Sequence, residues 1–475
     1  MLKGLHSDVL KTVQEIIKLK KQSRNSVILV EDIKSLLSPI KPIGHEEPSE
    51  QTCNVLMDPT PKVTTGEGVE GYAALFRSRF EKSMRILSQR PDSKRISKVA
   101  SVKKDARNGS AKHGSGREER GGQSGSASIV AGLLMSKRSK KNGIELAIDD
   151  YTGILSVMAL TEDIKRQAAA LALDQMVMLE VENRNKNFPG ITTVKNIFSP
   201  DIPEHLPNRS KSESYAVLIS DMHVGSKYFM EAEFVRFLEW LSSTDDEIVG
   251  KIKFLCFAGD LIDGIGIFPN QDEELVEMDA AKQMTRAVDL LAKVPKRIKM
   301  FVIPGNHDPG RRALPQPSIP REDLAERLCS FENCSMLGNP GFIELNGVKI
   351  LMYHGQSLDD VIATTPGLSY SKPAEAMKVL LRARHLAPIY GGKTPIAPEQ
   401  EDMMVITEVP DILHSGHVHV VDIQNYRGTL IVNSGAWQSQ TKFQQTMGIQ
   451  PTPGIAILVN LATMQPFVHD FNLQR

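Results

Sequence analysis

The sequence predicts a multidomain chain with an N-terminal helical segment, a small β-barrel, and a layered α/β domain whose mixed sheets are flanked by helices. Near the N-terminus, apolar residues recur every three to four positions, as on one face of a helix. Short strand-like runs then follow one another closely over residues 127–200. From residue 213 onward, continuous apolar runs alternate with amphipathic helical patterns, which is typical of strands buried between helical layers.

The composition is that of an ordinary globular protein. Of the 475 residues, 41% are apolar and 24% are charged, and the formal net charge is zero. The four cysteines form no C-x-x-C pair, so we expect reduced thiols rather than a zinc site. No apolar run approaches the roughly 20 residues that cross a membrane, and the N-terminus lacks the apolar core of a signal peptide. We therefore expect a soluble, cytoplasmic protein.

The first ninety residues divide into three expected segments. Residues 1–40 should form a small helical region, because their apolar residues make one stripe. Residues 41–70 are rich in Pro, Glu, Gly and Thr and show no period, which indicates a linker. Residues 71–90, GYAALFRSRFEKSMRILSQR, regain the helical pattern and should form a further helix.

Residues 91–126 consist mainly of Ser, Gly, Lys and Arg, with almost no large apolar side chain. Such a segment buries too little surface to fold, so we expect a disordered basic linker. From Arg77 to Arg120 there are 14 Lys and Arg against 5 Asp and Glu. Two interpretations stay open. The segment is either a solvated linker or a basic arm that contacts DNA phosphates and releases their counterions.

Ordered structure is expected again over residues 127–200. The runs SIVAGLLM, GIELAIDDYTGILSVMAL, MVMLEVENRN and ITTVKNIF read as successive strands separated by turns. Short strands at this spacing suit a small closed barrel, for which an OB-fold is the leading candidate. Periodicity alone does not exclude another kind of barrel.

Residues 213–475 should form the α/β domain. Its strands are the runs YAVLIS, KIKFLCFAG, IKMFVIPG, VKILMYHG and TLIVNSG, and the helix between the second and third should bury a stripe that begins at Met278. Polar residues follow the strands, at the edge where α/β sheets bind their ligands. In chain order these residues are Asp221, His223, Asp260, Asp263, Asn306, His307, Asp308, His354, His417 and His419.

These residue types point to a pair of divalent metal ions. Two such ions about 3.5–4 Å apart can clamp a phosphodiester and activate water, and a carboxylate can bridge them. Imidazole mixed with carboxylate suits Mn, Fe, Zn or Co better than Mg or Ca. One D-x-H or one G-N-H-D motif would be weak. Five motifs in this order, each at the end of a buried strand, make a coincidence improbable.

The motifs D-x-H, G-D-x-x-D, G-N-H-D, H-G and G-H-x-H resemble those of the calcineurin-like metallophosphoesterase superfamily. A narrower similarity lies in GDLIDGIGIFPNQ, PGNHDPGRRALPQP, YHGQSLDD, RARHLAPIYG, HSGHVH and NSGAWQSQTKFQ. These stretches resemble the small subunit of the euryarchaeal family D DNA polymerase. The similarity covers the α/β domain and, more weakly, the barrel and the helix at 71–90.

That resemblance implies a small subunit of a replicative DNA polymerase with metal-dependent 3′–5′ exonuclease activity. It implies two divalent ions, with manganese the first candidate. It also implies a large catalytic subunit, DNA with single-stranded or frayed 3′ ends and the sliding clamp as partners, and a nucleoid-associated location. One ion would be held by a first ligand set, and the second by another set that shares one bridging carboxylate. The first set is Asp221, His223, Asp260 and His419; the second set is Asp260, Asn306, His354 and His417.

The resemblance further implies that His307 faces the scissile phosphate and stabilises the transition state or protonates the leaving 3′ oxygen. Asp263 stands where related nucleases carry a second catalytic histidine, which increases the weight on His307. Four further residues could contact substrate or equally serve as surface or ion-paired charges. They are Arg311, Arg312, Arg384 and His385.

Two other functions compete with an exonuclease. A purely structural assembly subunit would share the two-domain plan, but in this chain every ligand position is filled. A phosphatase of the same superfamily would share the metal site, but the barrel and the basic segment favour nucleic acid.

Overall fold

The computed structural model describes residues 51–104, 127–182, 191–320 and 326–472. The helical region expected at 1–40, the first part of the linker at 41–70 and residues 105–126 lie outside the described residues. Within the described ranges, no helix is both long enough and apolar enough to cross a membrane.

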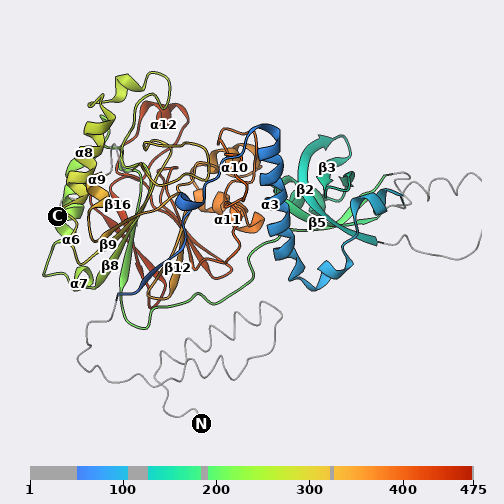
Figure 1. The fold of residues 1–475 in the computed structure, drawn as a ribbon, viewed down its shortest axis with the longest axis horizontal. Coiled ribbons are helices and arrows are strands. Elements are labelled where there is room, and N and C mark those ends of the chain that lie inside the picture. Colours follow the sequence, from blue (N-terminus) through green and yellow to red (C-terminus); the bar gives the residue numbers. More distant parts are fainter. Residues whose placement is uncertain (1–50, 105–126, 183–190, 321–325, 473–475) are drawn as a thin grey trace, which may run out of the picture. The chain divides into compact units, whose positions relative to one another are not determined.

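The α/β domain is built on two six-stranded sheets (Figure 1). Parallel pairs occupy the middle of the first sheet and one side of the second, and antiparallel pairs complete each sheet, so both sheets are mixed, as predicted. The first sheet has the order β1 (Cys53–Met57), β11 (Gly341–Leu345), β12 (Val348–Met352), β13 (Ile412–Ser415), β15 (Thr429–Asn433), β14 (Asp422–Tyr426). The second has the order β10 (Cys334–Met336), β9 (Lys299–Ile303), β8 (Ile252–Ala258), β7 (Tyr215–Ile219), β16 (Ile455–Asn460), β17 (Gln465–Asp470).

The two sheets pack face to face, and helices cover their outer faces. Between the sheets lies a fully apolar layer that includes Phe254, Phe301 and Ile350. The helices α6 (Glu231–Leu241) and α8 (Ala280–Leu291) pack on the second sheet, and α10 (Leu358–Thr364) and α11 (Pro373–Ala383) pack on the first. Strands buried on both faces explain the continuous apolar runs in the sequence.

The buried stripe of α8 begins later than the periodicity predicted. Met278 is 55% exposed, because the helix starts only at Ala280, after its N-cap Asp279. The side chain of Asp279 accepts hydrogen bonds from the backbone N–H groups of the first turn. Met278 therefore lies outside the helix, and the stripe starts at Met284.

Residues 127–182 and 191–198 form a closed five-stranded barrel. Its strands are β2 (Ala127–Lys140), β3 (Gly143–Asp149), β4 (Ile154–Ala159), β5 (Met176–Glu182) and β6 (Thr193–Phe198), in the spatial order β2-β3-β4-β6-β5. The helix α5 (Glu162–Ala169) joins β4 to β5. Strand β2 pairs with both β3 and β5, and at Gly132 a side chain would lie 2.6 Å from the Asp149 carbonyl oxygen. Glycine is required where the ribbon turns from one partner to the other.

The expectation of a disordered linker is wrong for residues 91–104. The segment forms a short 3₁₀ helix, η2 (Pro91–Arg95), and then helical turns over 99–104. Val99 and Val102 are fully buried in the barrel core, three residues apart on one face. The Val99 N–H donates to Asp150 and the Ser97 N–H to the Ile129 carbonyl. The two valines supply the apolar surface that the overall composition of the segment hid.

The linker expected at 41–70 is also partly wrong. Residues Cys53–Met57 form β1, which extends the first sheet by antiparallel pairing with β11. The helix predicted at 71–90 is confirmed as α3 (Gly68–Ser88). Its Leu75 packs in the cluster over the first sheet and its Leu87 in a cluster with barrel strands. The helix therefore contacts both domains (Figure 1).

Candidate metal centre and its cavity

Polar residues that follow four strands meet at one edge of the two sheets, as the sequence predicts. Asp221 and His223 follow β7, Asp260 follows β8, His354 follows β12, and His419 lies beyond β13. All five side chains are at most 5% exposed. Parallel strands present their carboxyl ends at one edge, so residues far apart in sequence come together there.

The backbone carries strain at this edge. Five of the predicted ligands have φ angles between 54° and 67°, in the left-handed region that residues other than glycine seldom adopt. Such residues are costly and gather at functional sites. The five are Asp221, His223, Asp260, His417 and His419.

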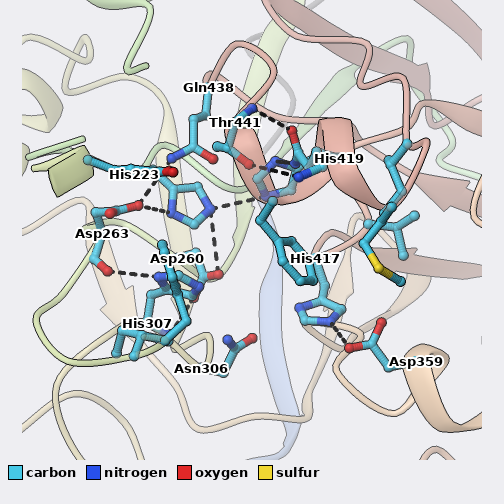
Figure 2. A pocket seen from close by; sticks show the side chains of 18 of the residues that line it. His223, Asp260, Asp263, Asn306, His307, Asp359, His417, His419, Gln438 and Thr441 are labelled. Carbon is cyan, nitrogen blue, oxygen red and sulfur yellow. Dashed lines mark hydrogen bonds and ion pairs between the residues drawn. The ribbon is translucent and has the colours of Figure 1, made fainter. Parts of the chain in front are cut away.

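A first group of ligand atoms consists of Asp221, His223 and His419. Figure 2 shows the two histidines. The Nε2 atoms of the two histidines face each other at 3.1 Å. The Asp221 Oδ1 atom lies 3.4 Å from His419 Nε2 and 3.8 Å from His223 Nε2. Buried ligand atoms that converge on one point in this way fit a divalent cation.

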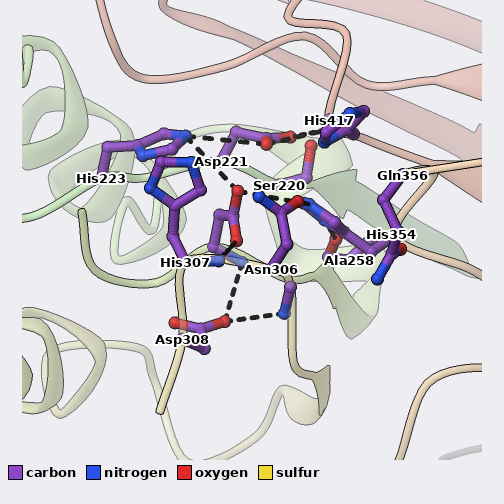
Figure 3. Close-up of polar contacts among 12 residues, drawn as sticks. Ser220, Asp221, His223, Ala258, Asn306, His307, Asp308, His354, Gln356 and His417 are labelled. Carbon is purple, nitrogen blue, oxygen red and sulfur yellow. Dashed lines mark hydrogen bonds and ion pairs between the residues drawn. The ribbon is translucent and has the colours of Figure 1, made fainter. Parts of the chain in front are cut away.

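A second group lies around His354 (Figure 3). The His354 Nδ1 atom is 2.7 Å from the Ala258 carbonyl oxygen, so this nitrogen carries the proton. The Nε2 lone pair then points at two oxygens, Asn306 Oδ1 at 3.0 Å and Asp260 Oδ2 at 3.2 Å. Three electron-rich atoms so close repel one another unless a cation lies among them. The donor set therefore fits a metal ion.

A proton on the histidine can supply the positive charge that these electron-rich atoms need. Burial lowers the pKa of His354, but the carboxylate of Asp260 overcomes it and raises that pKa to about 9. Burial likewise works against the charge of His223, whose pKa is nevertheless held well above its usual range by hydrogen bonds to Asp221 and Asp263. The carboxylates thus create a strongly cation-binding environment.

Asp260 stands between the two groups. Its Oδ2 atom is 3.2 Å from His354 Nε2 and 3.7 Å from His223 Nε2, and its Oδ1 atom accepts the His307 N–H at 2.8 Å. This position suits a carboxylate that reaches two ions, although the bridging role itself stays a prediction.

His417 differs from the other predicted ligands. Its Nε2 atom lies 3.3 Å from Asp359 Oδ2, and Asp359 also accepts a hydrogen bond from the Tyr370 hydroxyl. Its ring centroid is 5.2 Å from that of His354, and its backbone N–H donates to Asp221 at 2.9 Å. If Asp359 holds the Nε2 proton, the Nδ1 atom is the one left for a metal.

His307, which is expected from the sequence to face the substrate, lies beside the predicted ligand His223. Its Nδ1 atom lies 2.7 Å from the Asp263 carbonyl oxygen, and its ring meets that of His223 edge-on at 4.7 Å. Burial lowers its pKa. His307 also lies close enough to His223 and Asp260 to share an ion with them. The geometry is therefore compatible with a ligand as well as with the predicted substrate-facing role.

Asp263 and Asp308 support the ligands rather than join them. Asp263 Oδ1 accepts from His223 Nδ1 at 2.9 Å. Asp308 accepts backbone N–H groups of four residues in the two loops after β8 and β9, Asp260, Leu261, Ile262 and Gly305. Burial, with repulsion from Asp260 in second place, raises the pKa of Asp308 to about 7. The sequence shows Asp308 in the motif but gives no sign of this role.

The candidate centre opens into a cavity of about 590 Å³. Sequence reasoning missed most of its walls, since they come from loops without a known motif. Lys393 and Tyr370 lie on one part of the wall. Two apolar stretches line the rest: Ile267, Phe268 and Pro269, and Phe443, Met447 and Ile449.

The four residues that were predicted as possible substrate contacts lie in different environments. The structure contradicts this role for Arg384 and His385, which are buried with their donors used internally: Arg384 donates to the carbonyls of Ile406 and Thr407, and His385 to Asp402. Arg311 forms an ion pair at 2.6 Å with the buried Glu399 and hydrogen-bonds to Pro315. Arg312 is exposed, and its contact with substrate stays a prediction.

Fold and site together define a protein with a closed barrel, a domain of two packed mixed sheets, and a cluster of residues suited to divalent metals. The family of DNA polymerase alpha/epsilon B subunits matches residues 216–419. The DNA polymerase II small subunit of Archaeoglobus fulgidus is 35% identical over 417 residues, which cover 87% of this chain and 78% of that protein. The chain thus belongs to the family of archaeal DNA polymerase II small subunits.

The protein of the same name from Pyrococcus horikoshii is 40% identical over 416 residues. The match covers 84% of this chain but only 63% of that longer relative. A solved structure of an archaeal phosphodiesterase aligns with 54% of this chain and 98% of its own, at 12% identity and a TM-score of 0.28. So distant a likeness carries nothing about function.

Proposed function

We propose that this chain is a metal-dependent 3′–5′ exonuclease that removes nucleotides from DNA ends within a replicative polymerase. The observation that carries the proposal is the convergence of three histidines, two aspartates and one asparagine on two adjacent ligand groups. The six are Asp221, His223, Asp260, Asn306, His354 and His419. A purely structural subunit has no need of such a cluster, which is buried and strained.

When bound, two divalent ions would neutralise the phosphodiester and activate the attacking water. Manganese is the first candidate, with iron, zinc and cobalt as alternatives, because the donors mix imidazole and carboxylate. The chain's own residues fix the geometry. The Ala258 carbonyl and Asp263 each accept a ring proton, so that His354 and His223 present Nε2 to the site.

His307 would act on the substrate. Its lowered pKa keeps the imidazole neutral at neutral pH, and an incoming phosphate would raise that pKa by charge attraction. The proton so acquired could be held against the phosphate oxygens or passed to the leaving 3′ oxygen. The proposal therefore treats His307 as a catalytic residue, with a ligand role as the alternative.

A large polymerase subunit is the proposed partner, and the barrel is its proposed docking site. We assign the barrel to the OB-fold class, because five strands close in the order β2-β3-β4-β6-β5. Its described aromatic rings are few: Phe198 is covered by Arg90, and Tyr151, although 55% exposed, meets Phe80 edge-on. Apolar side chains such as Met135 and Ile154 are about half exposed, which favours a protein partner.

The test uses the full chain, alone and with the large subunit, on end-labelled single-stranded DNA. We expect shortening from the 3′ end with Mn²⁺ and none with a chelator. Asp260→Ala should abolish cleavage and lower the bound metal, whereas the exposed nearby Asp272→Ala should change neither. Cleavage by Asp260→Ala at the wild-type rate, or an inert wild-type complex loaded with metal, would refute the exonuclease and leave an assembly role.

A further inference from the structure

The walls of the catalytic cavity contain large apolar side chains whose exposure to water is unfavourable. Phe443 is 59% exposed and Met447 is 47% exposed, and both line the cavity together with Phe268. Hydrolysis of a phosphodiester needs only charged and polar groups near the phosphate. Exposed aromatic surface beside them calls for a ligand with an apolar, flat part.

One of these walls is fixed directly to the metal centre. Phe443 lies on α12 (Lys442–Thr446), whose first turn is closed by a capping box between Thr441 and Gln444. The Gln444 Nε2 atom also lies 2.8 Å from Nδ1 of His419, a predicted ligand. The short helix therefore holds Phe443 at a set position relative to the ligand group, and it does so through a buried contact.

The wall that carries Phe268 is fixed in the same way. The Gln271 side chain accepts the Ile267 N–H at 2.9 Å and donates to Asp263 Oδ2 at 3.0 Å. Asp263 in turn holds Nδ1 of His223. The Phe268 ring centroid is 6.4 Å from that of His307. Each apolar wall is thus tied by one buried glutamine to a histidine of the centre.

We infer that these walls form a subsite for the unpaired terminal base of a nucleic acid strand, with Phe443 and Phe268 as stacking surfaces. The inference rests on the proposed exonuclease function and specifies what the site selects. A cavity of about 590 Å³ is in the range of single small-molecule sites, about 300–1,000 Å³. This volume suits one nucleotide unit.

The wall carries the carboxylates of Glu274 and Asp359 and, beside them, one cation that suits the phosphate of this occupant. The exposed Lys393 lines the cavity and can approach a backbone phosphate, while a base needs only an apolar face. Aromatic stacking accepts all four bases, so the subsite selects strand state rather than sequence. A paired terminal base must first leave its helix, which costs energy, whereas a frayed or mismatched base enters freely.

Binding without turnover tests the subsite. The full chain is titrated with a single-stranded oligonucleotide whose 3′-terminal base is 2-aminopurine, joined by a phosphorothioate that slows cleavage. Stacking on Phe443 should quench the 2-aminopurine fluorescence. Phe443→Ala and Phe268→Ala should each lose quenching and raise Kd about five- to hundredfold, the range for loss of one base-stacking ring. Phe443→Tyr should keep both, and Phe467→Ala, on the exposed strand β17, should match wild type.

A second oligonucleotide that lacks the terminal base allows a double-mutant cycle between this base and Phe443. Removing the base should weaken binding to wild type but change binding to Phe443→Ala little, because that variant has no ring on which the base could stack. Equal quenching in Phe443→Ala, additive losses, or no quenching by wild type would overturn the subsite. A wild-type chain that quenches the 2-aminopurine fluorescence but never cleaves DNA would refute the exonuclease and support the subsite. A wild-type chain that cleaves DNA, while Phe443→Ala binds and quenches as wild type does, would support the exonuclease and refute the subsite.

Discussion

Substitution of Arg79 by methionine should destabilise the protein strongly. Arg79 lies on α3 and is 1% exposed, as is its partner Asp402 at 2.8 Å. The guanidinium also donates to the carbonyls of Asp174, in the barrel, and Pro388, in the α/β domain. A single buried cation therefore connects the helix to both domains. Methionine keeps the length of the side chain and removes the charge.

The magnitude follows from what is left behind. Removing one partner of a buried ion pair costs about 3–5 kcal/mol, because the other charge stays buried without compensation. Asp402 keeps one partner, since His385 Nε2 lies 3.0 Å away. In the native protein, burial and then the charge of Arg79 lower the pKa of His385 to about 4. Without Arg79 that pKa should rise, and His385 can then take up a proton opposite Asp402.

This predicts a definite dependence on pH. Because the folded pKa of His385 is higher in Arg79→Met than in wild type, the variant binds a proton at a pH where the wild type does not. Its free energy of unfolding should therefore approach that of wild type as pH falls. The gap between the two should be near 3–5 kcal/mol at pH 8 and clearly smaller at pH 5. Native Asp402, whose pKa burial tends to raise but the charges of His385 and Arg79 hold well below its usual range, contributes stability that is lost only in acid.

Urea unfolding, followed by the fluorescence of Trp240 and Trp437, measures the free energy of unfolding. Arg77→Met on the exposed face of the same helix is the matched control and should stay within about 0.5 kcal/mol of wild type. A titration of His385 by NMR should show its pKa rising in Arg79→Met. A loss below about 1 kcal/mol, or a gap that does not change with pH, would refute the reasoning.

Four further predictions concern function and the barrel. His307→Ala should lose activity by about 10²- to 10⁴-fold while both metals stay bound; metal analysis that finds one ion missing would make His307 a ligand. Val102→Asp should unfold the barrel in a thermal melt, because it buries an unpaired charge, whereas Lys104→Asp should not. Residues 105–126 carry four Lys and Arg against three Asp and Glu, so their deletion should leave the salt dependence of DNA binding nearly unchanged. Replacing the exposed Lys98 and Lys104 by Gln should instead flatten its slope, by about 0.9 for each phosphate that the protein no longer neutralises; equal slopes would exclude this edge of the barrel from DNA binding.

The sequence predicted the strands that carry the site, because strands that are buried on both faces have continuous apolar sequences. It also predicted which residues meet, since the carboxyl ends of parallel strands share one edge. It could not predict β1, whose residues Val55 and Leu56 are 49% and 38% exposed. That strand exists through hydrogen bonds to β11, nearly 300 residues away in the chain, and such pairing leaves no local pattern.

Charge misled the prediction where burial was hidden. Residues 91–104 read as a basic linker, although two valines three residues apart were enough to anchor them in the barrel. Arg384 and His385 read as substrate contacts, although they satisfy carbonyls and a carboxylate inside the domain. A sequence shows that a residue is charged but not whether its partner is solvent, substrate or the protein itself.

The cost of the candidate centre bears on the choice between an active subunit and a structural one. Five left-handed backbone conformations cost on the order of 1–3 kcal/mol each, and the carboxylates of Asp221, Asp260, Asp263 and Asp308 are all at most 5% exposed. Two histidines must take up protons to hold this cluster together without metal. An apolar strand edge would give assembly a more stable platform at no such cost. The features that lower stability are those a cation and a phosphodiester would use, and this is the physical argument for an active site.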